Sequence, residues 1–457
     1  MEQYSLSVKI GSRRTTFVKG WQIGFWIIIF AAAYMVRDLM KVSVPDIVFT
    51  GICAAAFMLL DLESTLAMYL FTMVLTVPNF EIRLVYLCIM LGKFVLQKRR
   101  LNLVMLIAAL TLVALELVNV ILFSKKSLYR MLWDFGDVAM YILLPLFWMG
   151  MQFSQKVCSR AMLGYVVGSL FGGVVLLLLS GNAVGWDVLL ENENLRLGSL
   201  NLSGRVDSEG MVTSYNPNQL AIMQTVSASL VFLLMHKKEL PKLIGIIMLV
   251  PMAAIVLFTK SRTGTLMFVA LMAVYFLYIV LSRKRFFLGL AVAAGAVLLF
   301  TVLQIYFPVA MQGLLGRFSG QKDITNGRGD LFVQYMNAWT DDPWCFFFGY
   351  GKVSFYDVVD IWQSPHNILT DILISYGLVG LISICTQWWL LIWCSFRKIP
   401  KQMRFFAFLP AILALIVDIA GQYITTGYPH VRLCALLLLA ALFAETPAED
   451  PVERSVV

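Results

Sequence analysis

The chain has 457 residues, of which 60% are hydrophobic and only 14% charged, and its mean hydropathy is +0.80. A soluble protein of this length would have too little polar surface to cover itself, so a polytopic membrane protein is indicated. The formal net charge of +9 does not require a nucleic-acid partner, because Lys and Arg also orient membrane proteins.

Apolar runs long enough to cross a bilayer predict an all-α polytopic fold with about 14 transmembrane helices in one membrane domain, 1–457. The runs cover residues 20–36, 45–60, 64–79, 82–97, 101–123, 138–153, 161–180, 218–235, 241–259, 264–281, 286–307, 366–394, 404–425 and 430–444. The second, third and sixth runs are short for a span.

The distribution of basic residues predicts the orientation. If the N-terminus is cytoplasmic and every run crosses, more than half of the 36 Lys and Arg residues fall in the predicted inner segments, as the positive-inside rule requires. The first run lacks a small-residue cleavage site and is expected to remain as a helix. Residues 445–457 are expected to form a short disordered cytoplasmic tail.

Two long segments are expected on the outer side, at 181–217 and 308–365. Loops of this length in a compact domain are often functional. In the second segment the apolar residues within 328–339 have the spacing of an amphipathic helix, which is expected to lie on the membrane surface. Gly349-Tyr350-Gly351 then predicts a turn.

Several polar residues are expected to be structural. Of the seven cysteines only Cys345 lies in an outer loop, so no disulfide framework or metal-ligand spacing is indicated. Glu116 and Asp418 lie within apolar runs, where a hydrogen-bonded structural role is favoured over a polar pathway. The acidic residues of the large loop are most simply solvated charges; these are Asp341, Asp342, Asp357 and Asp360.

Arginines on the outer side are the first functional candidates. Arg262 occupies a very short connection between two spans, where an arginine can also simply reach the headgroups. Arg328 is expected at the start of the amphipathic helix, and Arg317 lies earlier in the same loop. Either could equally be a solvated loop charge.

His366 is the second candidate, at the point where the large loop meets a long apolar run. In a continuous helix of about 100° per residue, Gly377 and Gly380 would share its face and admit a backbone or a lipid chain. An imidazole can take up or release a proton near neutral pH, although an interfacial histidine held by a carbonyl is the simpler interpretation. Asn216-Pro217-Asn218 before the eighth run reads most simply as a helix cap and turn.

Taken together and in order, these motifs resemble those of the superfamily of O-antigen ligases and O-antigen (capsular polysaccharide) polymerases, over about residues 200–385. They are Asn216-Pro217-Asn218, Ser261-Arg262, Arg328 ahead of Trp339, and His366-Asn367 followed by Gly377 and Gly380.

The resemblance implies a GT-C-like glycosyltransferase of the bacterial inner membrane, acting at the extracytoplasmic face on an undecaprenyl-diphosphate-linked glycan. Arg262 and Arg328 would bind the diphosphate, with Arg317 as a further cation, because the guanidinium fork matches phosphate oxygens. His366 would be the base for the acceptor hydroxyl. The substrate contacts would include Asn218 and Asn367. No cofactor or metal is expected, and the transfer would invert the anomeric centre.

Three alternatives stay open. Within the family, a ligase would transfer the glycan to lipid A-core or to a protein, whereas a polymerase, which is favoured, would extend a lipid-linked repeat. A transporter or flippase would also be polytopic, but transporters gather polar features near the midplane of related halves. A non-catalytic scaffold would not need two arginines and a histidine on one side. Membrane lipid and other polysaccharide-assembly proteins are the expected partners.

Overall fold

The computed structural model describes residues 20–151, 155–192, 195–198, 216–283, 328–359, 361, 367–399 and 404–421, with scattered positions between 287 and 312. Within these residues every regular element is a helix, so the predicted all-α fold is confirmed. The helices are α1 (Gly20–Asp38), α2 (Asp46–Leu59), α3 (Thr65–Thr72), α4 (Asn79–Leu96), α5 (Leu103–Phe123), α6 (Leu128–Met149), α7 (Gln155–Val184), α8 (Trp186–Glu191), α9 (Pro217–His236), α10 (Lys242–Phe258), α11 (Arg262–Arg283), α14 (Arg328–Thr340), α15 (Pro343–Phe348), α16 (Phe355–Val358), α17 (Ile368–Lys398) and α18 (Arg404–Gly421).

Six of the described helices are long and apolar enough to cross a membrane: α1, α5, α6, α7, α9 and α17. Shorter apolar helices lie in α2, α10, α11 and α18. The predicted number of about 14 is not established, because the predicted spans 286–307 and 430–444 lie largely or wholly outside the described residues. The third predicted span contains a helix of only 8 residues, α3.

Helix α6 begins at Leu128, well before the span expected from 138. The extra turns carry acidic residues that are paired with basic ones. Asp134 lies 2.8 Å from Lys126, and Asp137 forms an ion pair with Arg83 of α4. A hydropathy scale scores a paired charge in the same way as an unpaired one, so the apolar run underestimates the length of the helix.

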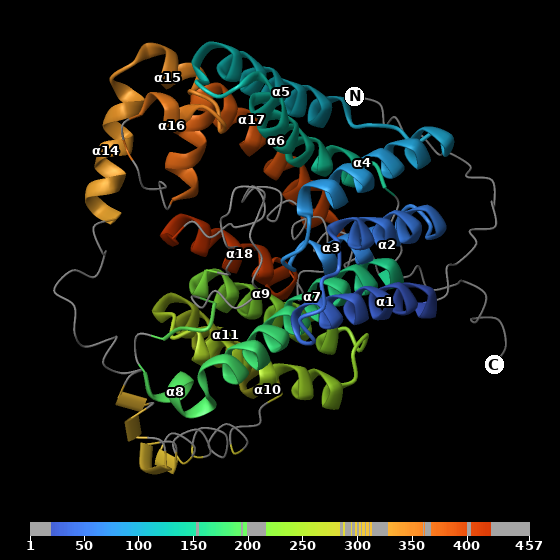
Figure 1. Ribbon diagram of the computed structural model, residues 1–457, viewed down its shortest axis with the longest axis vertical. Coiled ribbons are helices and arrows are strands. Elements are labelled where there is room, and N and C mark those ends of the chain that lie inside the picture. Colours follow the sequence, from blue (N-terminus) through green and yellow to red (C-terminus); the bar gives the residue numbers. More distant parts are fainter. Residues whose placement is uncertain are drawn as a thin grey trace.

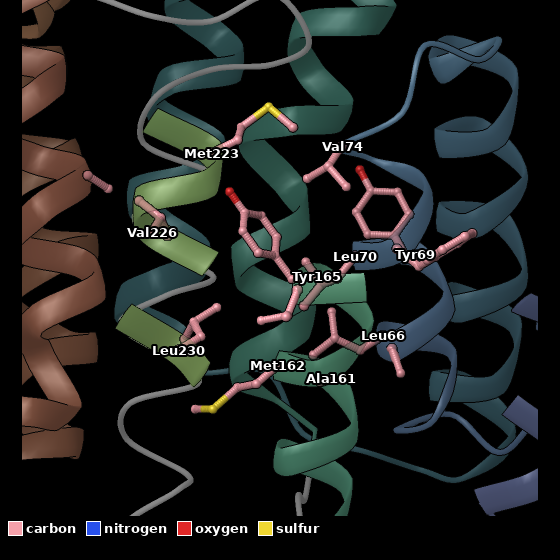
Figure 2. Close-up of a cluster of buried hydrophobic side chains, with 14 of the residues drawn as sticks. Leu66, Tyr69, Leu70, Val74, Ala161, Met162, Tyr165, Met223, Val226 and Leu230 are labelled. Carbon is pink, nitrogen blue, oxygen red and sulfur yellow. The ribbon is translucent and has the colours of Figure 1, made fainter. Parts of the chain in front are cut away.

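The centre of the bundle is a three-helix contact in which α7 lies between α3 and α9 (Figure 2). Gly164 and Gly168 of α7 allow the close approach to α3, since a Cβ at either position would overlap the carbonyl oxygen of Ala67 or Phe71. Small residues at such contacts let transmembrane helices pack backbone to backbone. On the other side, α9 is the most deeply buried of the six helices, with 89% of its apolar window inside the protein.

Segments predicted to share one side of the membrane contact one another. Lys125 donates its backbone N–H to Asp357 at 3.1 Å, which joins two predicted outer segments. Arg99 pairs with Glu63 at 2.6 Å, which joins two predicted inner segments. We call the end of the bundle that carries α8 and α14 to α16 the loop end; it lies at the left of Figure 1.

The described part of the large loop, residues 328–359, packs against α17 and α5. Helix α14 confirms the amphipathic helix expected over 328–339: Leu331 and Tyr335, one turn apart, are buried, whereas Val333 is exposed. The predicted turn is also confirmed, because Gly349 and Gly351 adopt φ angles of 70° and 80°. This left-handed backbone favours glycine and reverses the chain after α15.

Candidate functional site

The predicted site residues are only partly described by the structure. Arg262 is described fully and begins α11. Arg328 begins α14, although its side chain lies outside the described residues. His366 and Arg317 both lie outside the described residues, so their predicted roles remain predictions.

Arg262 lies in a tight turn between two apolar helices. α10 ends at Phe258, Lys260 adopts a φ of 48°, and the hydroxyl of Ser261 accepts the N–H of Gly264 at 3.2 Å in the first turn of α11. The Arg262 side chain is half-buried and makes no hydrogen bond or ion pair with any residue that the structure describes. The first N–H groups of a helix carry partial positive charge, so a cation there adds to the local positive potential.

Asn218 connects this turn to two other segments. Its Oδ1 accepts a hydrogen bond from the Ser261 hydroxyl at 2.7 Å and one from Arg196 Nη2 at 2.7 Å. Arg196 Nε also donates to the carbonyl of Thr259 at 3.0 Å. We call these four residues the polar junction. The predicted motifs at 216–218 and 261–262 therefore meet directly, through the Ser261–Asn218 hydrogen bond, and Arg196 from outside both motifs reinforces the contact.

The sequence patterns did not identify Arg196 as a candidate site residue. It is one arginine within the predicted outer loop 181–217, with no periodic pattern or motif around it. Only the folded arrangement shows that its guanidinium spans the starts of α9 and the α10–α11 turn. The predicted substrate contact Asn218 thus uses its oxygen inside the protein, while its amide nitrogen donates to no residue that the structure describes.

Lys260 has a structural role beside the polar junction. Its ammonium group donates to the carbonyls of Leu189 at 3.1 Å, Leu190 at 3.4 Å and Asn192 at 2.5 Å. These are carbonyls at the C-terminal end of α8, which otherwise lack partners within the helix. The turn that carries Arg262 therefore also caps α8, and Leu197 adds a backbone bond to the Phe258 carbonyl at 3.0 Å.

Asn367, the second predicted substrate contact, is the N-cap of α17. Its Oδ1 accepts from the backbone N–H of Leu369 at 2.8 Å, and its Nδ2 donates to the carbonyl of Ile419 at 2.9 Å. The side chain thus fixes the start of α17 against α18. The position next to His366 in the chain is held at the loop end by these bonds.

The glycine face expected below His366 is interrupted. Gly377 has φ 60° and ψ −160° and breaks α17, so Gly380 does not continue the helical phase from the first turn. A Cβ at Gly377 would overlap the backbone at Phe347, and a Cβ at Gly349 would overlap the backbone at Ser375. The close approach is therefore to the α15 backbone. The break leaves the carbonyls of Ile374 and Ser375 to accept from Tyr350 and Gly351 at 2.8 Å each.

Buried polar groups of α5 hold the other side of the same loop segment. The Glu116 carboxylate is fully buried and accepts the backbone N–H groups of Lys352 at 2.8 Å and Val353 at 2.9 Å. Asn119 donates to the Phe348 carbonyl at 3.1 Å and accepts from Trp344 Nε1 at 3.1 Å. The structural role expected for Glu116 is confirmed in these contacts.

Loop carboxylates also serve the fold. Asp342 caps α15 and accepts the Tyr350 hydroxyl at 2.6 Å. Burial raises the pKa of Tyr350, and its hydrogen bond to Asp342 raises it further, so the phenol remains a donor. Within the described residues no three His, Cys, Asp or Glu side chains gather as a metal site would require.

Residues 247–385 match a family model described as O-Antigen ligase. The chain carries an O-antigen ligase domain. The match begins within α10, contains the turn with Arg262, and ends within α17. Ligases and polymerases of this family are glycosyltransferases of the membrane that act in polysaccharide and cell-envelope biosynthesis, so the predicted enzyme class and family are confirmed.

The match does not extend over the whole polar junction. Ser261 and Thr259 lie inside the O-antigen ligase domain, whereas Arg196 and Asn218 lie before it. A search of curated proteins found no match to the chain. The hydrogen bonds of the junction therefore join the domain to the helices that precede it.

Proposed function

We propose that the chain is a polysaccharide polymerase, which transfers glycan from an undecaprenyl-diphosphate-linked donor to a hydroxyl of a lipid-linked acceptor repeat unit. The observation that carries the proposal is Arg262, a half-buried cation at the N-terminus of α11, inside the O-antigen ligase domain and without a partner among the described residues. A guanidinium and a helix N-terminus both favour an anion, and a diphosphate is the leaving group of this reaction.

Fixed cations would supply most of the catalysis. Negative charge grows on the diphosphate as the anomeric bond breaks, so a cation held in place stabilises the transition state more than the ground state. The polar junction restrains the turn that carries Arg262 through the Ser261–Asn218 hydrogen bond. Arg328 at the start of α14 and Arg317 in the same loop would add further positive charge, in place of a metal ion.

His366 would act as the base. In this step the oxygen of the acceptor hydroxyl attacks the anomeric carbon, the bond from that carbon to the diphosphate oxygen breaks, and the hydroxyl proton passes to the imidazole. Direct displacement inverts the anomeric configuration. The bonds of Asn367 support this assignment, because they fix Asn367, which follows His366 in the sequence, at the start of α17.

The loop end would face the outside of the bacterial inner membrane. The distribution of Lys and Arg supports this orientation, since more than half of the 36 basic residues fall in the predicted inner segments. A lipid-linked donor that has already crossed the membrane would then meet the site from the bilayer.

The test is transfer by the purified protein in detergent or lipid nanodiscs. With a defined diphosphate-linked repeat unit as the only substrate, a polymerase yields lipid-linked products of two or more repeats. A ligase, the alternative suggested by the description of the matched family, yields product only when lipid A-core or a protein acceptor is added. Absence of product with every acceptor would overturn both assignments.

A further inference from the structure

A cavity of about 570 Å³ opens at the loop end, between α4, α6 and the loop segment 352–356. It shares no residue with the polar junction. Its walls come from the start of α4, the early turns of α6 that extend beyond the apolar run, and the loop segment that Glu116 holds in place. A concave site with a few fixed polar groups is the usual form of a small-molecule or saccharide site.

Paired charges line the cavity. Arg83 is only 3% exposed and donates to Asp137 and to the hydroxyl of Tyr141. Its Nε is a buried nitrogen without a hydrogen-bond partner among the described residues. Lys126 and Asp134 form a second pair at 2.8 Å. The cavity therefore offers fixed carboxylate acceptors beside fixed cationic donors.

Aromatic rings form part of the walls. Phe80 and Trp133 are stacked, with ring centroids 3.9 Å apart and planes at 22°. Trp133 is 42% exposed, and Tyr356 from the loop segment is 47% exposed. The faces of aromatic rings carry negative partial charge and attract the C–H groups of a sugar ring, while the hydroxyls of the same sugar meet carboxylate and guanidinium groups.

The charge balance favours a polyhydroxyl ligand over a lipid phosphate. Cations in the walls have carboxylate partners: Arg83 pairs with Asp137, Lys126 with Asp134, and Lys352 with Asp371. Asp134 and Asp137 themselves line the cavity and would repel a phosphate group. A neutral sugar hydroxyl can donate a hydrogen bond to the carboxylate of such a pair and accept one from the cation.

The cavity is also connected to the start of α17. Lys352 lines the cavity and pairs with Asp371 in the first turn of α17, and the N–H of Asp371 bonds to the carbonyl of Asn367 at 3.0 Å. We propose that this cavity binds a sugar segment of the acceptor glycan. The assignment to the acceptor, rather than to the donor, rests on the proposed function, in which the donor diphosphate binds at Arg262.

The experiment measures binding of a lipid-free oligosaccharide, released by mild acid from the diphosphate-linked repeat units of the source cells, to the purified full chain. Isothermal titration gives the dissociation constant, and saturation-transfer NMR identifies the sugar protons in contact. We expect Trp133→Ala to weaken binding at least about tenfold, since each factor of ten needs only about 1.4 kcal/mol. Tyr356→Ala, which removes the aromatic ring contributed by the loop segment, should do the same.

Leu132→Ala is the matched control. Leu132 directly precedes Trp133 in α6, is 55% exposed and does not line the cavity, so its replacement should change binding less than about twofold. Arg262→Lys should also leave binding of the lipid-free oligosaccharide unchanged while it lowers transfer. A wild type that binds this oligosaccharide but makes no product would therefore count against the proposed function alone.

Three results would overturn the sugar assignment. The first is that the wild type does not bind the oligosaccharide. The second is that Trp133→Ala and Tyr356→Ala both bind it as tightly as the wild type. The third is that Lys126→Ala no longer binds phosphatidylglycerol vesicles but binds the oligosaccharide as before. The last result would identify the cavity as a headgroup site.

Discussion

Arg196 donates to the side-chain oxygen of Asn218 at 2.7 Å and so holds segment 195–198 against the start of α9. We expect Arg196→Lys to lower glycan transfer about tenfold or more, because an ammonium cannot reach Asn218 and the Thr259 carbonyl together and each charged hydrogen bond contributes about 1.5–3 kcal/mol. Arg100→Lys, an exposed arginine away from the junction, is the control and should retain full transfer in membranes with equal protein levels.

Arg262→Lys tests whether the guanidinium fork, rather than charge alone, is required. Lysine keeps the charge and loses the two-pronged geometry, so we expect transfer to fall about ten- to a hundredfold at unchanged protein level. Arg262→Ala should lower transfer by at least as much as Arg262→Lys. Initial rates at several donor concentrations give KM and kcat for each variant. If the lysine variant works as well as the wild type, Arg262 supplies only a general positive charge.

His366→Gln tests the base. A glutamine keeps polarity but has no basic nitrogen, so transfer should fall at least about a hundredfold, within the range that general base catalysis contributes. Binding of the lipid-linked donor should persist through the arginines. His236→Gln is the control: His236 stacks on Phe406 at the C-terminus of α9, outside the loop end, and its loss should change the rate less than about threefold. Loss of both binding and transfer in His366→Gln would assign the residue to structure.

Gly377→Ala tests the backbone contact between α15 and α17. A φ of 60° with ψ −160° is a glycine conformation, and a Cβ there would also overlap the Phe347 backbone, so we expect a loss of stability of about 1–3 kcal/mol or more. Thermal unfolding in detergent should show a lowered Tm. At Gly51, within α2, a Cβ would meet no atom within 4 Å, so Gly51→Ala should leave the Tm unchanged or slightly raised. Equal Tm values for the two variants would contradict the proposed packing constraint.

Cysteine labelling tests the orientation. Thr340 is exposed at the end of α14, and Gln97 is exposed at the end of α4. In intact cells an impermeant thiol reagent should label Thr340→Cys and not Gln97→Cys, both in a cysteine-free background. A variant that retains Cys345 as its single cysteine should stay unlabelled near neutral pH, because burial raises the pKa of this thiol to about 12. Labelling of Gln97→Cys alone would put the loop end in the cytoplasm.

Local patterns were enough to predict the elements. Apolar runs located the long apolar helices and the spacing of apolar residues located α14, because each pattern depends on residues only a few positions apart, whereas the short helices α8, α15 and α16 were not predicted. The cap at Asn216 and the turn at Gly349 follow from side-chain chemistry at single positions.

Long-range relations were not predictable in the same way. The part of Arg196 in the polar junction depends on contacts with α9 and the α10–α11 turn, and no sequence pattern encodes such a distance. The break at Gly377 depends on the approach of α15, so a continuous helical face was the wrong expectation there. The early start of α6 depends on partners for Asp134 and Asp137 that lie in other segments.

The Glu116 carboxylate has a consequence for biosynthesis. Its partners, the backbone N–H groups of Lys352 and Val353, lie 236 and 237 residues later in the chain. Because a ribosome makes α5 first, this carboxyl group enters the bilayer long before those partners exist, and an ionised group there is costly. The nascent chain must therefore keep Glu116 protonated or hydrated until the large loop has been synthesised and docked, which makes loop docking a late step in assembly.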